Sequence, residues 1–389
     1  MQLKIKHPLE WATNSGYEIK CTDDAYRGEV KLVYCQFSAF NIGSMEVAKS
    51  AYRNPYYIHA KDAKLLVVNN DRSNLTHNYR YFIISKEGDL LADEHLNRSF
   101  WLQFFNFFKF INADTIVLDE NRVSSSILLP ASQEYAFVGG HAHFGHWLAD
   151  HLPIILFFEK NKIKCNSFHY LTSLLNSFQI ESLQECAVEG KISQLNFGTD
   201  YLSIVDVPDL HLLVDLSVFQ SYEMLRSKLC GSMMQPPIAT PVHGVPKRKV
   251  YLERGVQRGL NRLSNESEVI DLLKGYGFDI IKPHELSLAT KKKMFSEFDL
   301  FVCPPGSAFF NFHIFSKKSA HLLYCVQETV LNNMNDAVFG GTYYQCPDLY
   351  RTSLLIAEQK SVTNFGAPQY DAACHIPIEE LKAKLLTLI

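Results

Sequence analysis

A histidine-rich segment holds the densest group of side chains that could do chemistry. Four histidines crowd around one aspartate there: His141, His143, His146, His151 and Asp150. On a helix, His146 and Asp150 would share a face because they are four residues apart, so either could remove a proton from a hydroxyl group. The His141-x-His143 spacing also permits a metal site, while Pro153 would kink or break a helix continued this far. A histidine that only holds the helix entry by hydrogen bonds is the structural alternative.

Arginine side chains follow a predicted strand, Arg248–Glu253, in the C-terminal part of the chain. Arg254 comes directly after this strand, and Arg258 and Arg262 follow in a glycine-rich loop. Guanidinium groups match the geometry of a diphosphate and can neutralise the charge that develops on a departing nucleoside diphosphate. The alternative is that these arginines form ordinary surface ion pairs with nearby glutamates such as Glu266.

A second strand, Leu300–Cys303, runs into the turn Pro304–Ser307, after which the pattern predicts a helix that contains Asn311. Backbone N–H groups at such a turn suit a phosphate, because Gly306 permits a close approach. Ser307 could cap the helix or bind the same ligand. An ordinary strand–turn–helix corner is the alternative.

An acidic residue, Glu285, follows a third predicted strand, Phe278–Ile281, and precedes a helix predicted over Ser287–Ser296. A carboxylate at this place can accept hydrogen bonds from ribose hydroxyls, as it does in other nucleotide-binding sheets. The alternative is an acid that only stabilises the helix N-terminus through the helix dipole.

The elements that must position these groups change character along the chain. The first third has the short β-branched and aromatic runs of strands, with a buried helix predicted over Glu94–Phe110. From about Tyr135, strands alternate with helices, which predicts a doubly wound parallel sheet. The Pro- and Gly-rich segment Gly231–Pro246 predicts a domain boundary. We therefore expect an α/β protein of two Rossmann-like lobes: residues 1–235 with a β-rich N-terminal segment, and residues 236–389, whose C-terminal helix could pack back on the first lobe.

The overall composition is that of a large folded protein. Of 389 residues, 47% are hydrophobic and 20% are charged, which argues against disorder, and the net charge of -3 gives no electrostatic reason to expect a nucleic-acid partner. The apolar runs are too short to span a bilayer, and the first residues do not resemble a signal peptide. The nine cysteines are scattered without a C-x-x-C pair, which indicates reduced thiols and a cytoplasmic protein.

In this order, the segments resemble glycosyltransferase family 61 over roughly residues 135–315. The family carries a His-Trp-Leu-x-Asp-x-Leu-Pro block, a strand ending in Arg, a second Arg followed by Asn-Glu, a Gly-Phe strand, a Glu-Leu-Ser helix start and a Pro-His-Gly-Ala turn. The matching positions here are His146, Trp147, Leu148, Asp150, Leu152, Pro153, Arg254, Arg262, Asn265, Glu266, Gly277, Phe278, Glu285, Leu286, Ser287, Pro304, Pro305, Gly306, Ser307 and Asn311.

The resemblance implies a two-lobed GT-B fold and a hexosyl- or pentosyltransferase that moves a sugar, with inversion, from a nucleotide-sugar donor to a hydroxyl of a glycan or glycolipid acceptor. It implies no metal and no other cofactor. Residues 236–389 would bind the donor and the first lobe the acceptor, with His146 or Asp150 as catalytic base. The expected donor-binding residues are Arg254, Arg262, Glu285, Gly306, Ser307 and Asn311. The resemblance further implies a bacterial cytoplasmic member, at the inner face of the membrane, that builds capsule or lipopolysaccharide.

One departure from the family pattern keeps two alternatives open. Pro305 stands where the family turn has histidine, and Ser307 replaces the alanine. A degenerate transferase that serves as a scaffold in polysaccharide assembly is therefore one alternative. The other is a metal-dependent hydrolase built on the cluster from His141 to His151.

Overall fold

The computed structural model describes fifteen stretches of the chain. These are residues 1–21, 55–69, 79–91, 107–112, 114–139, 144–161, 168–197, 202–214, 216, 218–231, 246–255, 263–317, 319–327, 352–359 and 373–389. The predicted boundary segment Gly231–Pro246 lies almost wholly outside the described residues, as does most of the helix predicted over Glu94–Phe110. Where that helix prediction can be examined, it is wrong, because Phe108–Asn112 forms a strand.

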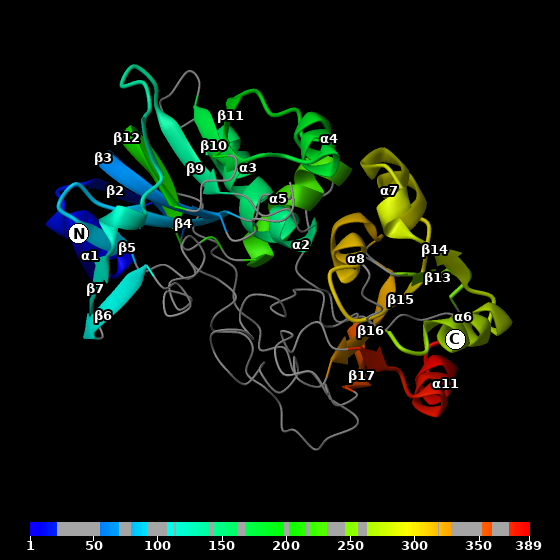
Figure 1. The fold of residues 1–389 in the computed structure, drawn as a ribbon. Helices are drawn as coiled ribbons and strands as arrows, with labels where there is room; N and C mark the ends of the chain where they lie inside the picture. The colour runs from blue at the N-terminus through cyan, green and yellow to red at the C-terminus, as the bar shows by residue number, and fades with distance from the viewer. Residues whose placement is uncertain are drawn as a thin grey trace. The chain divides into compact units, whose positions relative to one another are not determined.

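The chain divides into two compact units. Unit 1 comprises Met1–Arg27 and Arg53–Ser217, and unit 2 comprises Gly28–Tyr52 and Val218–Ile389. Each unit is built on one sheet, so the protein is a mixed α/β structure with a large mixed sheet and a smaller, mainly parallel, curled one (Figure 1).

Twelve described strands form the mixed sheet of unit 1, whose main path runs β11-β10-β9-β12-β3-β4-β5-β1-β7-β6, with β2 on β3 and β8 on β12. The strands are β1 (Gln2–Lys6), β2 (Glu18–Cys21), β3 (Tyr56–Asn69), β4 (Tyr79–Ile84), β5 (Asp89–Leu91), β6 (Phe108–Asn112), β7 (Thr115–Leu118), β8 (Ser125–Leu128), β9 (Tyr135–Gly139), β10 (His169–Ser173), β11 (Lys191–Leu195) and β12 (Leu202–Val214). The helices of this unit are α1 (Pro8–Asn14), η3 (Glu120–Arg122), α2 (Phe144–His146), η4 (Trp147–His151), α3 (Leu152–Asn161) and α4 (Ser177–Glu185).

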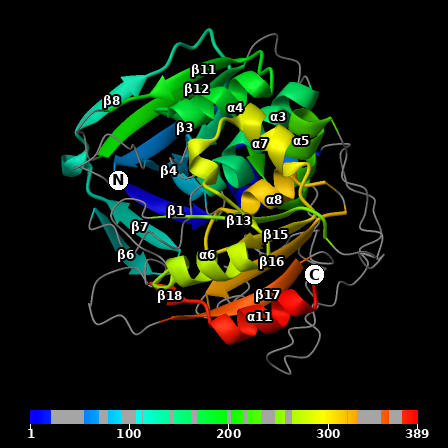
Figure 2. The same ribbon diagram turned by 90° about the vertical axis from the view of Figure 1, so that its right-hand side faces the viewer.

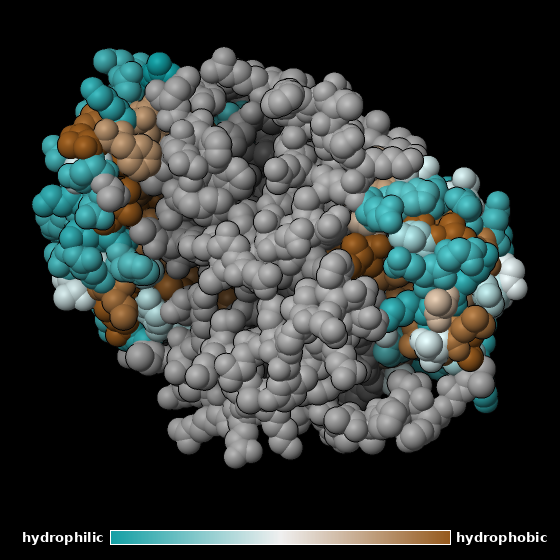
Figure 3. Space-filling view, turned by 90° about the horizontal axis from the view of Figure 1, so that it is seen from below, coloured by the Kyte–Doolittle hydropathy of each residue, from teal (hydrophilic) through white to brown (hydrophobic). Residues whose placement is uncertain are grey.

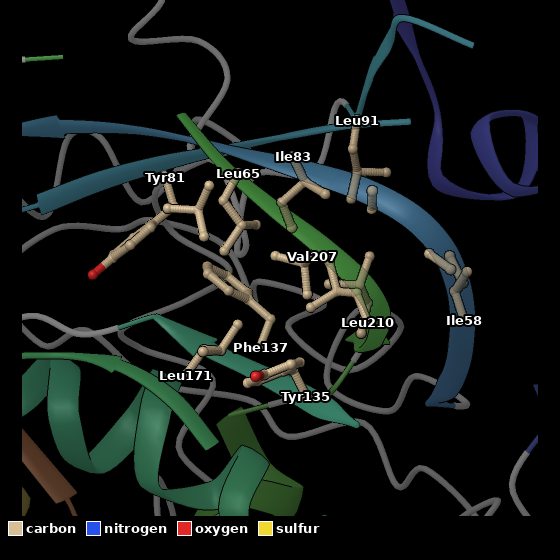
Figure 4. Close-up of a cluster of buried hydrophobic side chains, with 14 of the residues drawn as sticks. Ile58, Leu65, Tyr81, Ile83, Leu91, Tyr135, Phe137, Leu171, Val207 and Leu210 are labelled. Atoms are coloured by element: carbon tan, nitrogen blue, oxygen red, sulfur yellow. The ribbon is translucent and has the colours of Figure 1, made fainter. Parts of the chain in front are cut away.

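The two longest strands, β3 and β12, pair antiparallel and carry much of the unit 1 core. Figure 4 shows their apolar side chains against those of β4, β9 and β10, with Phe137 edge-on to Tyr81 at a centroid distance of 5.3 Å. The alternation of core residues shifts by one position at Asp62 of β3, whose φ is +56°, and at the facing position of β12, while the pairing of the two strands stays one-to-one. Opposite it in β12 stands Pro208, which cannot donate to the ladder.

Strands β9, β10 and β11 pair parallel in sequence order, so this edge of the sheet is the alternating α/β part of unit 1. The connection from β9 to β10 runs through α2, η4 and α3, and the connection from β10 to β11 runs through α4. The Asn176 side chain caps α4 by accepting a hydrogen bond from the Gln179 N–H. The Gln179 side chain in turn accepts one from the Asn176 N–H, which completes a capping box. The alternation of strands and helices in this region was predicted. The helix α4 itself was missed.

The sheet of unit 2 has the order β14-β13-β15-β16-β17-β18, and all pairs except the last are parallel. Its strands are β13 (Lys249–Leu252), β14 (Asp279–Ile281), β15 (Leu300–Cys303), β16 (His321–Gln327), β17 (Thr352–Gln359) and β18 (Cys374–His375). Its helices are α5 (Val218–Cys230), α6 (Glu266–Gly275), η5 (Pro283–Glu285), α7 (Leu288–Phe295), α8 (Phe309–Phe315) and α11 (Ile378–Leu386). Because the order reverses between β13 and β15, this pair marks a topological switch point, where open α/β sheets bind ligands beyond the strands' carboxyl ends.

Helices cover both faces of the unit 2 sheet (Figure 2). On one face, Val302 packs with α6 and with α11, which buries Leu381 and Leu385 in the core of this unit. On the other face, Phe301 contacts Phe312 of α8, with 5.2 Å between ring centroids. Successive residues of β15 thus point to opposite apolar layers, as expected for a buried parallel strand.

Apolar residues also reach the surface in isolated positions. Leu128 and Leu386 are the most exposed large hydrophobic side chains of the described residues, and Figure 3 shows apolar residues interspersed with hydrophilic ones on the described surface of one face. Single exposed apolar side chains are normal for a folded protein. Among the described residues, no helix is long and apolar enough to cross a bilayer.

Candidate functional site

Arg254 and Gly306 meet at the switch point of the unit 2 sheet. Arg254 follows β13, Gly306 follows β15, and the Arg254 Nη1 donates a hydrogen bond to the Pro305 carbonyl. The guanidinium lies so close that a Cβ at Gly306 would stand 1.5 Å from Nη1 and 2.6 Å from Cζ. Gly306 also has φ +112°, which disfavours other residues. A side chain at position 306 is therefore incompatible with the place of Arg254.

The loop that carries Arg254 is held by Glu266, the first residue of α6. The Glu266 carboxylate accepts hydrogen bonds from the backbone N–H of Arg254 at 3.0 Å, from that of Gly255 at 3.2 Å, and from the Tyr251 hydroxyl at 3.1 Å. Burial, followed by the nearby Glu266 charge, raises the pKa of Tyr251 well above its ordinary value, so Tyr251 stays a donor. The alternative in which Glu266 is a surface ion-pair partner of the arginines differs from the structure, where its carboxylate accepts a hydrogen bond from the backbone of Arg254. Its place in the family pattern was the signal for this role.

The turn that follows β15 offers both backbone and side-chain polar groups. The Gly306 N–H lies 3.4 Å from the Tyr324 hydroxyl of β16, and the Ser307 carbonyl accepts from the Phe310 N–H. Asn311 is 1% exposed in α8; its Nδ2 donates to the Ala308 carbonyl at 2.9 Å, whereas its buried Oδ1 has no hydrogen-bond partner among the described residues. Of the predicted residues in this turn, Gly306 and Ser307 are partly exposed and Asn311 is enclosed.

Glu285 lies at the same edge of the sheet, at the end of η5 after β14. Its side chain is 62% exposed, and Lys282 Nζ lies 3.9 Å from its carboxylate and 3.8 Å from that of Glu253. The lysine therefore stands between the loops that follow β13 and β14. Since the two strands are parallel neighbours, Glu285 comes from the strand next to the one that presents Arg254. Arg258 and Arg262 lie outside the described residues.

Asp299 secures the opposite end of the two switch-point strands. Its carboxylate accepts from the backbone N–H groups of Lys247 and Arg248, at 3.0 and 2.9 Å, and pairs with Lys317 at 2.5 Å. Although partial burial opposes it, the hydrogen bond from Lys317 and those from the backbone lower the pKa of Asp299 below its ordinary value. The start of β13 is thereby fixed beside that of β15.

In unit 1, His146 and Asp150 lie on one face of a helical turn, as their spacing predicted, and they form a hydrogen bond with each other. His146 Nδ1 lies 2.7 Å from Asp150 Oδ2, and the side chains are only 17% and 14% exposed. The turn between them is a π-helix, η4, rather than the predicted α-helix; such turns are rare and occur often at functional sites. With Asp150 ionised, Nδ1 carries the ring proton and donates it, which makes Nε2 the basic nitrogen.

The neighbouring residues hold this turn in place. His151 Nδ1 donates to the Val138 carbonyl at 2.8 Å, and the buried Trp147 donates from Nε1 to the Ser182 hydroxyl at 2.7 Å. Pro153 does not interrupt a helix, because α3 begins at Leu152 and its second residue needs no N–H partner. His151 therefore takes the structural role considered for this cluster. His141 and His143 lie outside the described residues. The structure therefore does not test the metal-dependent hydrolase that the sequence left as an alternative.

The comparisons with known proteins agree with this reading of the motifs. Residues 144–323 match the family model described as Glycosyltransferase 61, a stretch that contains both the His146–Asp150 pair and the Arg254–Gly306 contact. None of the curated proteins compared with the chain matches it. Residues 144–323 are therefore similar to a glycosyltransferase family 61 domain, and such a domain implies a transferase that uses a sugar donor and an acceptor.

Proposed function

We propose that the chain is an inverting glycosyltransferase that binds a nucleotide-sugar donor at the carboxyl edge of β13 and β15. The observation that carries this proposal is the Arg254 guanidinium seated on the Gly306 turn at the switch point of the unit 2 sheet. Open α/β sheets bind ligands at this place, and a guanidinium there can hold a diphosphate and offset the charge of the leaving group.

In the proposed complex, Arg254 binds the diphosphate together with Arg262 and the backbone of Gly306 and Ser307. Glu285 accepts from the ribose, as the acid after the second strand does in other nucleotide-binding sheets. The family histidine is replaced by Pro305, but the contact to Arg254 uses the carbonyl of this residue, which any side chain would leave in place. This supports an active transferase over a degenerate one.

The proposed chemistry is one displacement. His146 Nε2 takes the proton of the acceptor hydroxyl, whose oxygen bonds to the anomeric carbon while the bond from that carbon to the diphosphate oxygen breaks. Asp150 stabilises the imidazolium that forms, and Arg254 stabilises the nucleoside diphosphate that leaves. One displacement inverts the anomeric centre. The step requires no metal or other cofactor, and Asn311 contributes by shaping the turn after β15.

The two-lobed GT-B arrangement, with residues 1–235 on the acceptor side and 236–389 on the donor side, belongs to the proposal. So do a hexosyl or pentosyl donor, a glycan or glycolipid acceptor, and a role in capsule or lipopolysaccharide assembly in the cytoplasm at the inner face of the membrane. These finer assignments rest on the family resemblance.

A turnover assay tests the proposal. The purified full chain is incubated with a panel of nucleotide sugars, and released nucleoside diphosphate is measured. Arg254→Ala should lower turnover roughly 10²–10³-fold, as removal of one transition-state donor does. Arg248→Ala is the matched control, because this exposed arginine lies just before the amino end of β13 and pairs with Glu297 and Asp279. Equal turnover by wild type and Arg254→Ala would refute the assignment of the diphosphate site.

A further inference from the structure

Two histidines and an aspartate that belong to neither group described above converge on one face of the unit 1 sheet. His59 lies on β3, directly opposite His211 of β12, and Asp209 is two residues before His211 on the same face. The imidazole rings are stacked, with 4.3 Å between centroids and 8° between planes. Within the described part of the chain, this is the group whose nitrogen and oxygen atoms could together hold a metal ion, all within 4.8 Å of one another.

His211 is the unusual member of this group. Its ring is 4% exposed, and neither nitrogen forms a hydrogen bond with any described residue. Glu134 Oε2 does lie 3.2 Å from His211 Nε2, which is ion-pair distance without hydrogen-bond alignment. Burial, with the nearby His59 adding to it, lowers the pKa of His211 below its ordinary value. A buried neutral imidazole without a hydrogen bond costs free energy unless something else binds its lone pair.

We propose that His59, Asp209, His211 and Glu134 bind a divalent metal ion of the zinc type. Two neutral imidazole nitrogens with two carboxylate oxygens form a ligand set that zinc accepts in a tetrahedral site. The ligand atoms are His59 Nε2, His211 Nε2, Asp209 Oδ1 and Glu134 Oε2. No thiol takes part, and the site is independent of the proposed donor site in unit 2.

Three of the distances between these atoms can be compared with those around such an ion, and the stacked rings would have to turn so that both ring nitrogens point at it. Zinc bonds of about 2.0–2.1 Å place tetrahedral ligand atoms roughly 3.3 Å apart. His211 Nε2 is 3.2 Å from Glu134 Oε2 and 3.6 Å from Asp209 Oδ1, while the 2.5 Å between His59 Nε2 and Asp209 Oδ1 must lengthen by roughly 1 Å.

The surroundings provide the outer contacts that metal-binding histidines use. Glu18 Oε2 lies 3.6 Å from the other nitrogen of His59, Nδ1, where a carboxylate can orient a ligating ring. Lys61 binds the second oxygen of Asp209, Oδ2, and leaves Oδ1 for the ion. The ion would balance the charges of Asp209 and Glu134, while Glu18 is paired with Lys20 at 2.7 Å. Phe168 closes the site by packing edge-on against His211, at 4.9 Å.

The test is a titration of chelator-treated, reduced full chain with Zn²⁺ alone, followed by calorimetry and thermal unfolding. Wild type should bind one ion per chain at this site and unfold at a higher temperature with Zn²⁺, because the ion binds only the folded state. His59→Gln and Asp209→Asn, whose side chains are partly exposed, should fold and lose this ion. His169→Gln is the control, since its ring bonds Ser193 and belongs to no ligand set among the described residues. His211→Ala would repeat the loss if it folds.

Substitution with Co²⁺ identifies the ligands. The proposal predicts a nitrogen–oxygen spectrum without the charge-transfer band that thiolate ligands give, and the spectrum should be absent from His59→Gln and Asp209→Asn. A wild-type protein that binds no ion would overturn the proposal. So would an ion that both variants retain, or one held by cysteine thiolates. Because the measurement is metal binding, its failure would leave the transferase proposal untouched.

Discussion

The Arg254 side chain occupies the space that a Cβ on Gly306 would need. The gap from Nη1 to that Cβ would be 1.5 Å, although the two residues are 52 positions apart and follow different strands. Glycine at position 306 and arginine at position 254 thus depend on each other. The pair joins the two loops at the switch point, and the proposed diphosphate site is built on it.

Gly306→Ala should therefore displace Arg254 and lower donor turnover about as far as Arg254→Ala does, at a stability cost of roughly 1–3 kcal/mol from backbone strain. Two glycines separate the causes. Gly277 also has positive φ, +75°, but a Cβ there meets nothing within 4 Å, so Gly277→Ala should cost stability and keep turnover. Gly275→Ala, within α6, should stabilise by about 1 kcal/mol. If Gly306→Ala kept full turnover, the observed position of the Arg254 side chain would not be required for turnover.

Glu266→Gln tests whether the loop of Arg254 must be held. The charged carboxylate accepts from two backbone N–H groups and the Tyr251 hydroxyl, and hydrogen bonds to charged groups contribute about 1.5–3 kcal/mol. We expect a lower urea midpoint and a raised KM for the donor. Glu268→Gln, an exposed acid in the same first turn of α6, should change neither by much. If the two substitutions had the same effects, Glu266 would act only through its interaction with the helix dipole and not by holding the loop of Arg254.

Asp150→Asn should separate chemistry from donor binding. The amide can still bond His146 Nδ1, but it lacks the charge that supports an imidazolium, so turnover should fall roughly 10²–10⁴-fold. Nucleoside diphosphate affinity should stay at the wild-type level, because the proposed donor contacts belong to unit 2. Asp114→Asn, at an exposed turn, is the matched control. A variant that transfers sugar at the wild-type rate would remove the pair from the mechanism.

Asp299→Asn tests how much the charge of Asp299 contributes to the stability of unit 2 and how this contribution depends on pH. A carboxyl group with a lowered folded pKa stabilises the protein above its unfolded pKa, and this stability is lost as the pH falls through the folded value. The variant should therefore be less stable than wild type at pH 7, by about 1 kcal/mol since the pair is partly exposed. The difference should shrink as the pH falls below the ordinary carboxyl pKa of 3.8 and vanish below the lower pKa of the folded state. If the difference in stability were the same at pH 3 as at pH 7, it would come from the change in side-chain packing and not from the charge of Asp299.

Local sequence signals predicted the elements of unit 2 well. The strand Leu300–Cys303 has the predicted bounds, and α7 begins after Ser287, whose hydroxyl accepts from the Thr290 N–H. The sequence pattern predicts Ser264 as the N-cap of α6, but Asn265 stands at that position, and its side chain bonds the backbone of Ile376 instead of the helix. Capping and apolar runs act over a few residues, which is why sequence alone can locate them.

Such local signals do not predict which strands pair or which side chains touch when the segments lie far apart in the sequence. The twelve-stranded order of unit 1 depends on pairings such as β12 with β3, which no local pattern specifies. The types of residue at the donor edge were predicted, but the contact of Arg254 with the turn at Gly306 was not. The π-helical turn at His146 and the cluster around His211 were likewise missed, since each depends on packing that a linear spacing does not encode.

Calorimetric titration of the full chain with a panel of nucleoside diphosphates tests the central claim most directly. Wild type should bind at least one of them, and Arg254→Ala should weaken that affinity roughly 10–100-fold, the equivalent of a charged hydrogen bond of about 1.5–3 kcal/mol. Arg248→Ala should bind as wild type does. If no nucleoside diphosphate bound to wild type, or if Arg254→Ala bound it equally well, the donor site would not lie at this edge of the sheet.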